Sequence, residues 1–494
     1  MVNGAGDESR RERHVIDAVD KGVFIGGRWR ESGDGRTFGV ADPSTGEELC
    51  RVADASPADG MAALAAADAA QEAWAAYPPR ERGEILRRGY ELLMARQDDL
   101  ALLMTLEMGK PLPEAKGEIA YAAEFLRWFS EEAVRIDGGY AVPPAGTGRF
   151  LVTRRPVGPC LLITPWNFPM AMGTRKIGPA VAAGCTMVVK PAPQTPLSML
   201  ALAGILREAG LPEGVLSVLP TSRAGEVCEP LMRDGRIRKL SFTGSTVVGK
   251  LLLEQSAEQV LRVSLELGGN APFLVFEDAD LDAAVDGAML AKMRNIGEAC
   301  TAANRFYAHE SIAEEFAARL SKRMEALTVG RGTDEGVQVG PLIDDAARDK
   351  VQSLVEDAVG RGAKVATGGA PVDGPGFFYR PTVLANVPPG VAMAETEIFG
   401  PVAPIGTFAS DDEALRLAND TPYGLVSYLY TQDLTRALKV SEALDTGMVG
   451  LNTGLVSNPA APFGGVKHSG LGREGGTVGI DEFLETKYVA IGGI

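Results

Sequence analysis

Short apolar runs alternate with longer segments of helical periodicity through the middle of the chain, from Cys160 to Phe276. The apolar runs are CLLITPW, TMVVKPA, GVLSVLP, IRKLSFTG, RVSLELGG and APFLVF. Strands that are apolar on both faces and alternate with helices are typical of a parallel sheet covered by helices on both sides. The pattern therefore predicts an α/β fold here, with ligands bound at the carboxyl ends of the strands.

A second alternation of helices and strands runs from Ala279 to about Leu451, and it predicts a second α/β unit. Its helical segments are residues 311–327 and 345–359. Its strand patterns are residues 379–387, 402–408, 426–431 and 449–451.

The first part of the chain has a different pattern. Charge dominates residues 1–20, which predicts a flexible arm. The run GVFIGGRWRES predicts a small hairpin from Val23, and DPSTGEE predicts a turn. Helical periodicity then covers residues 57–76, with Ser56 as a cap, and residues 80–107 and 113–136.

Two alternating ribbons, residues 146–159 and 483–491, have no predicted partner in their own domain. Unpaired strand edges readily pair with another chain. The ribbons therefore predict a sheet between subunits, in a homodimer or a homotetramer.

Composition narrows the class of protein. A chain of 494 residues is too long for one ordinary core, so two or three domains are expected. The net charge is −16 and no long Lys/Arg block occurs, which argues against nucleic acid as a partner. No apolar run approaches the length of about 18 residues that a membrane span needs, and the N-terminus lacks an apolar segment. We therefore expect a cytoplasmic protein without a membrane partner.

The cysteines point to one candidate nucleophile. Five cysteines, at positions 50, 160, 185, 228 and 300, have no metal-like spacing, which argues against a disulfide framework and against a metal site. Cys300 has glycine before it, small residues after it, and Arg294 and Arg305 nearby. Cations and backbone N–H groups lower the pKa of a thiol and make it reactive. The alternative is a small buried side chain. The chain has three histidines, which leaves little room for a Cys–His or Ser–His pair. If Cys300 is a nucleophile, its expected base is therefore a carboxylate.

Polar residues follow several predicted strands. They are Trp166-Asn167, Lys190, Thr243-Gly244-Ser245 and Glu266. The segment FTGSTVVGK reads as a strand, a turn and a helix start, which offers backbone N–H groups to a phosphate but is also a common connection. Glu266 lies between an apolar strand and Gly-Gly, where desolvation raises the pKa of a carboxyl toward that of a base. A carboxylate at the rim of the sheet is the alternative.

Seven blocks, in one order, resemble the aldehyde dehydrogenase superfamily over nearly the whole chain. They are TPWNFP, VVKPA, FTGSTVVG, LELGGN, GEAC, EIFGP and PFGGVKHSG. The resemblance implies an aldehyde dehydrogenase-like α/β fold. Its parts would be a Rossmann-type cofactor domain at 1–142 and 160–268, an α/β catalytic domain at 269–468, and a small β oligomerisation arm at 143–159 and 469–494.

The resemblance also implies roles for individual residues. Cys300 matches the nucleophile and Glu266 the base that activates water, while Asn167 and the Cys300 backbone N–H match the oxyanion hole. The residues that match contacts to NADP or NAD are Thr164, Pro165, Trp166, Lys190, Pro193, Gly244, Ser245, Leu267, Glu397 and Phe399. The implied chemistry is thiolate addition to an aldehyde, hydride transfer to nicotinamide and hydrolysis of a thioester, without a metal.

Longer runs, such as KMRNIGEAC and LNTGLVSNPAAPFGGVKHSGLGRE, look most like the succinate-semialdehyde dehydrogenases of that superfamily. Arg175, Arg294 and Ser457 match their carboxylate-binding set. A guanidinium binds a carboxylate through paired, charge-assisted hydrogen bonds. The resemblance therefore implies oxidation of succinate semialdehyde to succinate.

Three positions depart from the superfamily's usual pattern. Glu298 replaces the usual glutamine and adds a negative charge near the thiol. Pro193 replaces a glutamate that NAD-preferring relatives use for the ribose hydroxyls, so we expect NADP to be accepted at least as well as NAD. Ala302 stands where some succinate-semialdehyde dehydrogenases have a second cysteine, so a disulfide switch is not expected.

Other functions remain open at this stage. Within the superfamily, the substrate of the chain is alternatively glutarate semialdehyde, or a neutral or cationic aldehyde. Outside it, the alternative is an inert binding protein on the same fold. The presence of Cys300, Glu266 and Asn167 together argues against that last alternative.

Overall fold

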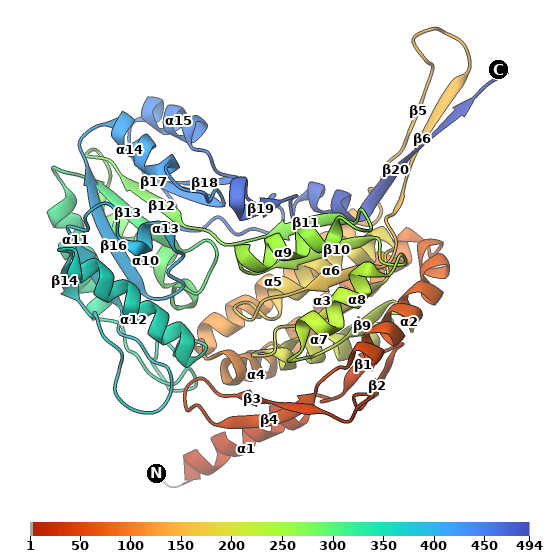
Figure 1. Ribbon diagram of the computed structural model, residues 1–494, viewed down its shortest axis with the longest axis horizontal. Coiled ribbons are helices and arrows are strands. Elements are labelled where there is room, and N and C mark those ends of the chain that lie inside the picture. The colour runs from red at the N-terminus through yellow and green to blue at the C-terminus, as the bar shows by residue number, and fades with distance from the viewer. Residues whose placement is uncertain (1–2, 494) are drawn as a thin grey trace.

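The computed structural model describes residues 3–493, and its largest sheet has eight strands (Figure 1). Their order is β19 (Gly470–Leu471), β11 (Arg262–Glu266), β10 (Lys239–Thr243), β7 (Cys160–Ile163), β8 (Met187–Lys190), β9 (Leu216–Val218), β1 (Val23–Ile25) and β2 (Arg28–Arg30). The strands from β11 to β9 are parallel, as predicted. The predicted hairpin is β1 and β2, and it pairs antiparallel with β9.

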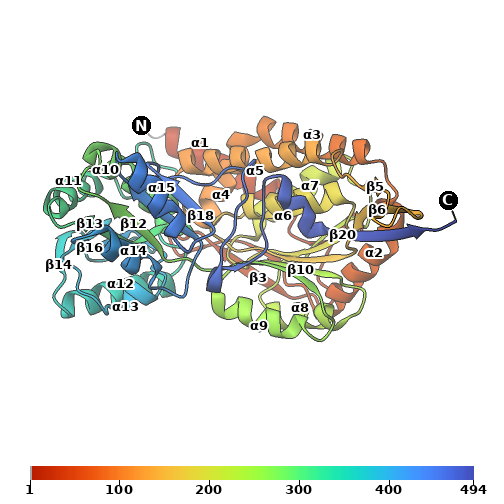
Figure 2. The same ribbon diagram turned by 90° about the horizontal axis from the view of Figure 1, so that it is seen from above.

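Helices cover both faces of this first sheet, because alternate strand residues enter two separate cores. Leu162 and Val189 enter one core, and Leu161 and Val188 enter the other. The helices on the first face are α3 (Pro79–Ala95), α4 (Gln97–Met108), α5 (Leu112–Glu132), α6 (Ala171–Ala183) and α7 (Pro196–Glu208) (Figure 2). Those on the second face are α2 (Pro57–Ala75), α8 (Ala224–Arg233) and α9 (Thr246–Ser256).

The second sheet has seven strands and lies beside the first (Figures 1 and 2). Their order is β14 (Lys364–Thr367), β15 (Thr382–Ala385), β16 (Val402–Phe408), β13 (Ala303–His309), β12 (Ala271–Val275), β17 (Val426–Tyr430) and β18 (Met448–Leu451). Its helices are α10 (Leu281–Met293), α11 (Ala313–Glu325), α12 (Asp345–Gly360), α13 (Ala392–Glu395), α14 (Asp411–Asn419) and α15 (Leu434–Ala443). This confirms the predicted second α/β unit.

The chain passes from the first sheet to the second between Glu266 and Ala271. The grouping of the run APFLVF with the first sheet was therefore wrong, since the run forms β12 of the second sheet. Continuous apolar character shows that a strand is buried, but not which sheet it joins. The connection is tight: a Cβ atom at Gly269 would lie 2.3 Å from the carbonyl oxygen of Cys300. Glycine is required there so that the two segments can approach each other.

A three-stranded antiparallel sheet projects from the body of the molecule (Figure 1). Its strands are β20 (Leu484–Ile491), β6 (Arg149–Pro156) and β5 (Gly139–Ala141). The two predicted ribbons, for which no partner was predicted in their own domain, pair with each other, since β6 and β20 are hydrogen-bonded along their whole length. Within the described residues, β20 still forms an edge of this sheet, and Tyr140 and Tyr488 on the sheet are exposed.

The N-terminal segment differs from its prediction as a flexible arm. Residues Asn3–Asp17 form helix α1, and Val15 and Ile16 are buried in the main core. Glu12 of this helix forms an ion pair with Arg331. The charged composition of this segment gave no sign of the apolar contact, because only two of its residues, Val15 and Ile16, make it.

The helix predicted over residues 80–107 was expected to be continuous, but it is interrupted at Arg96, which separates α3 from α4. Among residues 3–493, no helix has the length and apolar character needed to cross a bilayer.

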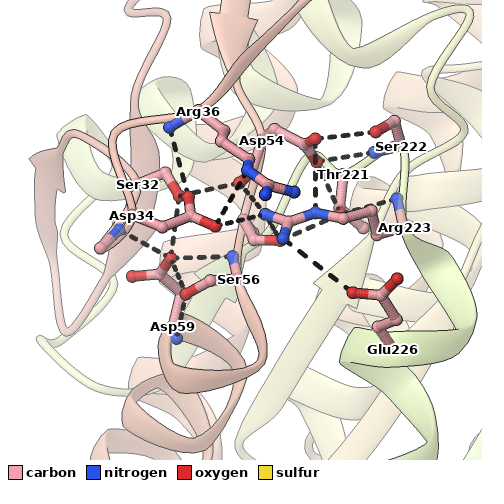
Figure 3. Close-up of polar contacts among 12 residues, drawn as sticks. Ser32, Asp34, Arg36, Asp54, Ser56, Asp59, Thr221, Ser222, Arg223 and Glu226 are labelled. Carbon is pink, nitrogen blue, oxygen red and sulfur yellow. Dashed lines mark hydrogen bonds and ion pairs between the residues drawn. The ribbon is translucent and has the colours of Figure 1, made fainter.

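A polar cluster joins the N-terminal segment to the first sheet (Figure 3). Ser56 caps α2 as predicted, and the Asp59 carboxylate accepts a hydrogen bond from the Ser56 backbone N–H, which completes a capping box. Arg223, which follows β9, donates to Asp34 at 2.9 Å and to the Asp54 carbonyl at 3.0 Å. The cluster thus ties the connection from β9 to α8 to the residues that precede β3 (Thr37–Ala41) and follow β4 (Glu48–Ala53).

Candidate active site

A cavity of about 300 Å³ lies at the carboxyl ends of first-sheet strands and beside the starts of β13 and β16 of the second sheet. Residues following β7, β10 and β11 form one wall. They include Pro165, Trp166, Asn167, Gly244, Ser245, Leu267 and Gly268. The position at the strand ends is the one predicted for a parallel sheet.

Cys300 lies on this cavity, in the connection between α10 and β13. The connection contains the 3-10 helix η1 (Arg294–Gly297), in which Asn295 and Ile296 have φ of 54° and 56°. These left-handed conformations are unfavourable for residues with a side chain, above all for a β-branched one. Local packing therefore holds this loop in one strained shape and sets the direction of the Cys300 side chain.

The Cys300 thiol is neutral at rest, contrary to the low pKa expected from nearby cations. Burial raises the pKa of the thiol to about 12, and Arg175 and Arg294 only partly offset that effect. Arg305 does not face the thiol, because its guanidinium donates to the carbonyl oxygens of Asn270, Leu417 and Ala418. The thiol therefore needs a base to become a nucleophile.

Asn167 lies beside the loop that carries Cys300. Its side-chain amide donates to the backbone carbonyl oxygen of Glu298 at 2.8 Å, and the backbone carbonyl oxygen of Asn167 accepts from the Asn295 side chain at 3.0 Å. Lys110 also donates to that carbonyl oxygen, at 2.8 Å. The bonds to the carbonyl oxygen fix the backbone of Asn167, and the bond to Glu298 orients its side-chain amide on the cavity that Cys300 lines and leaves the second N–H for another acceptor.

Glu266 ends β11 and is almost fully buried, with 2% of its surface exposed. Burial raises the pKa of its carboxyl well above the ordinary value, and the Glu474 carboxylate raises it further. Its Oε2 atom has no hydrogen-bond partner among the described residues. A carboxyl that is buried without a partner and lines the same cavity as a thiol is suited to exchange protons with water or with that thiol. The alternative of a rim carboxylate is excluded by the burial.

Arg175, Arg294 and Ser457 line the same cavity as Cys300. Arg294 donates to the Ser457 hydroxyl at 3.3 Å, and its guanidinium lies 4.8 Å from the centre of the Phe168 ring. Arg175 is buried on α6, forms an ion pair with Glu474, and has an Nη2 atom without a partner among residues 3–493. The structure thus gathers three residues that are far apart in the sequence.

The residues matched to the cofactor fall into two groups. Those lining the cavity are Pro165, Trp166, Gly244, Ser245, Leu267, Glu397 and Phe399. Thr164, Lys190 and Pro193 do not line it. Lys190 is the last residue of β8, and burial lowers the pKa of its ammonium group. Ser245 is the N-cap of α9 and accepts from the Val248 backbone N–H at 3.3 Å.

Lys350 was not predicted from the sequence, and Glu298 was expected to add a negative charge near the thiol. Lys350 of α12 lines the cavity near Glu397, whose pKa burial raises to about 7. Nothing in its surroundings, DDAARDKV, distinguishes it from a solvated lysine. Burial raises the pKa of the Glu298 carboxyl well above the ordinary value, which disfavours the negative charge expected near the thiol. Its Oε1 accepts from the Ile343 backbone N–H at 3.1 Å.

Two α/β sheets with a projecting third sheet, and a cavity in which a cysteine, a carboxyl and an amide converge, define the class of cysteine-dependent aldehyde oxidoreductases. The chain belongs to the aldehyde dehydrogenase family, whose sequence profile matches residues 29–489.

Individual relatives are similar over nearly the full length. The succinate-semialdehyde dehydrogenase of Paenarthrobacter nicotinovorans is 60% identical over 443 residues, 90% of this chain and 98% of the relative. The glutarate-semialdehyde dehydrogenase of Pseudomonas putida is 52% identical over 469 residues, 95% of this chain and 97% of the relative. A crystal structure of an NADP-dependent enzyme from E. coli superposes with a TM-score of 0.95 at 48% identity, over 97% of this chain and 99% of that one.

Proposed function

We propose that this chain oxidises succinate semialdehyde to succinate, with NADP or NAD as hydride acceptor. The observation that carries the proposal is the presence of two guanidiniums and a hydroxyl on the cavity that contains the Cys300 thiol. Paired guanidiniums match a carboxylate in charge and in hydrogen-bond geometry. A short aldehyde with a terminal carboxylate fits a cavity that offers a nucleophile at one place and these cations at another. The similarity to a succinate-semialdehyde dehydrogenase supports the same substrate.

The residues support a thiohemiacetal and thioester route. A base removes the Cys300 thiol proton, and the sulfur forms a bond to the aldehyde carbon. The oxyanion accepts hydrogen bonds from the Asn167 amide and the Cys300 backbone N–H. A nicotinamide cofactor held at the first-sheet side of the cavity would supply the acceptor for the hydride on this carbon. Glu266 then takes a proton from water as the water oxygen attacks the thioester, and the C–S bond breaks to release the acid and the thiolate.

The first-sheet side of the cavity fits a dinucleotide. The N-terminus of α9, which Ser245 caps, presents free backbone N–H groups and the positive end of a helix dipole, as a phosphate requires. The Thr243 hydroxyl next to it is buried without a partner in the described part of the chain. Glu397 and Lys350 offer an acceptor and a donor for ribose hydroxyls.

We further propose that NADP is accepted at least as well as NAD. Pro193 carries no charge that would repel a 2′-phosphate, and Lys190 offers a cation at the end of β8. Arg223, at the end of the neighbouring strand β9, is committed to Asp34 and Asp54 (Figure 3), so the proposal rests on Lys190. The similar E. coli structure is that of an NADP-dependent enzyme.

A second candidate substrate is glutarate semialdehyde, favoured by the 52% identity to a glutarate-semialdehyde dehydrogenase. It carries the same terminal carboxylate on a longer chain, so the same two arginines would bind it. The guanidiniums disfavour a cationic aldehyde.

We also propose a homodimer or homotetramer of three-domain subunits located in the cytoplasm, with the domain boundaries given by the sequence. The outer edge of β20 and the exposed apolar residues Val247 and Leu251 on α9 support assembly. β19, at residues 470–471, joins the first sheet although it follows the predicted boundary at 468. Light scattering of the purified protein tests the assembly.

A panel of aldehydes, each assayed with NADP and with NAD, tests the function. We expect the highest kcat/KM with succinate semialdehyde. Arg294→Ala and Arg175→Ala should each lower it by about 10- to 150-fold, the worth of one charged hydrogen bond, and should spare the neutral aldehyde butanal. Equal losses on the two aldehydes, or equal wild-type activity on both, would contradict the proposed substrate.

A further inference from the structure

Tyr121 lies on the cavity beside both arginines. It belongs to α5 and lines the cavity, and the Arg294 guanidinium carbon lies 5.8 Å from the centre of its ring. Burial acts to lower the pKa of Arg175, but Glu474 and then Tyr121 act in the opposite direction and the pKa is raised, so Tyr121 lies within electrostatic reach of Arg175. A helix predicted only to pack against the sheet thus brings a tyrosine to the cavity that both cations line.

We propose that Tyr121 is a substrate-binding residue whose hydroxyl donates a hydrogen bond to the carboxylate held by Arg175 and Arg294. The inference rests on the proposed function, because it assigns a further contact to the same substrate group. A phenol is both donor and acceptor, whereas a guanidinium only donates. The hydroxyl can therefore accept from an arginine and donate its own proton to the carboxylate.

Hydrogen bonds from α5 fix Tyr121 relative to both arginines. Glu114, two turns before Tyr121, accepts from the Asn295 backbone N–H at 2.9 Å, next to Arg294. Glu118, one turn before it, accepts from the backbone N–H groups of Met170 at 3.0 Å and Ala171 at 3.2 Å.

These bonds reach the two segments that carry the cations. Met170 and Ala171 begin α6, which carries Arg175, and α5 and α6 lie side by side (Figure 1). Two carboxyls on one face of α5 thus join it to both arginine-bearing segments, and the third residue on that face is Tyr121. Such a network holds a binding group in place before the ligand arrives, which lowers the entropic cost of binding.

A packing role alone does not account for the choice of tyrosine. The neighbouring wall of the cavity is apolar, with Phe168, Met172 and Phe463. Phe125 packs edge-on against the Tyr121 ring at 4.9 Å, so the ring has its apolar contact without the hydroxyl. Phenylalanine would serve for packing, and the hydroxyl is left for the ligand.

The test is Tyr121→Phe, which removes only the hydroxyl. We expect kcat/KM for succinate semialdehyde to fall about 10- to 100-fold through a higher KM, and kcat/KM for butanal to change less than about twofold. Competitive inhibition by succinate should weaken by the same factor as the KM rises, which reports binding without turnover.

Tyr90→Phe is the matched control. Tyr90 also lies beneath an arginine, with the Arg127 guanidinium carbon 5.5 Å from its ring centre, but it does not line the cavity. The control should leave activity with both aldehydes unchanged.

The outcomes separate this inference from the function on which it rests. If Arg294→Ala is selective for succinate semialdehyde but Tyr121→Phe is not, the proposed substrate stands and the role of Tyr121 is overturned. Equal losses with both aldehydes would assign Tyr121 to structure and overturn the inference. If Arg294→Ala is not selective, the proposed function fails and this inference fails with it.

Discussion

Arg175 and Glu474 form an ion pair inside the protein, with 1% and 6% of their side chains exposed. Lys176 binds the other oxygen of the same carboxylate. Burial alone would raise the pKa of Glu474, but Lys176 and Arg175 outweigh burial and hold it below the ordinary value. This carboxylate therefore fixes the guanidinium that we assign to the substrate and lies close enough to Glu266 to raise its pKa.

Removing the Glu474 charge should destabilise the protein. Glu474→Gln leaves two buried cations without a counter-ion, a change that costs about 3 to 5 kcal/mol in folding free energy. Calorimetry at neutral pH should show a clearly lower Tm. Glu84→Gln, in an exposed pair with Arg87 on α3, is the control and should leave Tm almost unchanged. Similar Tm values for the two variants would contradict the buried-pair account.

Loss of the thiol should separate chemistry from cofactor binding. Cys300→Ala should abolish aldehyde oxidation, because no other cysteine lines the cavity in the described residues, while NADP still binds through groups elsewhere. Glu266→Gln should still form NADPH in a burst of about one equivalent per site and then stall, since the thioester lacks its base. Fluorescence of NADPH in rapid mixing distinguishes the two variants. Substantial steady-state turnover by the Cys300→Ala variant would show that Cys300 is not the nucleophile.

Activity should rise with pH on the alkaline side of neutrality. The pKa of the Cys300 thiol is raised to about 12, and that of Glu266 is also raised. Both groups act in their deprotonated forms, so a higher pH populates the active state. The logarithm of kcat/KM, measured from slightly acid to alkaline pH, should climb across neutrality. A profile that falls over that range would show that these raised pKa values do not control the reaction.

The sequence could predict most of the fold and much less of the electrostatics. Apolar runs located the strands, because a buried parallel strand needs apolar residues on both faces. They did not show that APFLVF joins the second sheet, since the buried strands of both sheets require the same apolar residues. The blocks around Cys300 and Glu266 located the chemistry, but the raised pKa values of Glu298 and Cys300 follow from burial by distant segments. Nothing in the sequence distinguished Tyr121, because the apolar periodicity of a helix is the same whether a tyrosine hydroxyl on it contacts solvent or a ligand.

Glu298 should behave as a neutral acid. Since its pKa is raised by folding, its contribution to stability is full below the pKa of the unfolded carboxyl and is lost as pH rises toward the folded pKa. Glu298→Gln cannot ionise, so the variant should match the wild type in Tm at acid pH and exceed it at alkaline pH. Activity should stay near that of the wild type, because the amide oxygen can still accept from Ile343. A variant less stable at every pH would show that Glu298 is ionised and paired.

Cofactor preference should depend on position 193. Pro193→Glu places a carboxylate three residues after Lys190, close to the end of β8. There it would accept hydrogen bonds from ribose hydroxyls but repel a 2′-phosphate, because two negative groups a few ångströms apart oppose each other strongly outside bulk water. We expect kcat/KM with NADP to fall about 10-fold or more and kcat/KM with NAD to stay equal or rise, a difference of about 1.4 kcal/mol or more between the cofactors. Pro193→Gln is the isosteric control, and it should lower NADP use far less, because it supplies the same side-chain length without the charge. If the wild type prefers NAD by a hundredfold, or if the two variants change NADP use equally, the charge at this position does not select the cofactor.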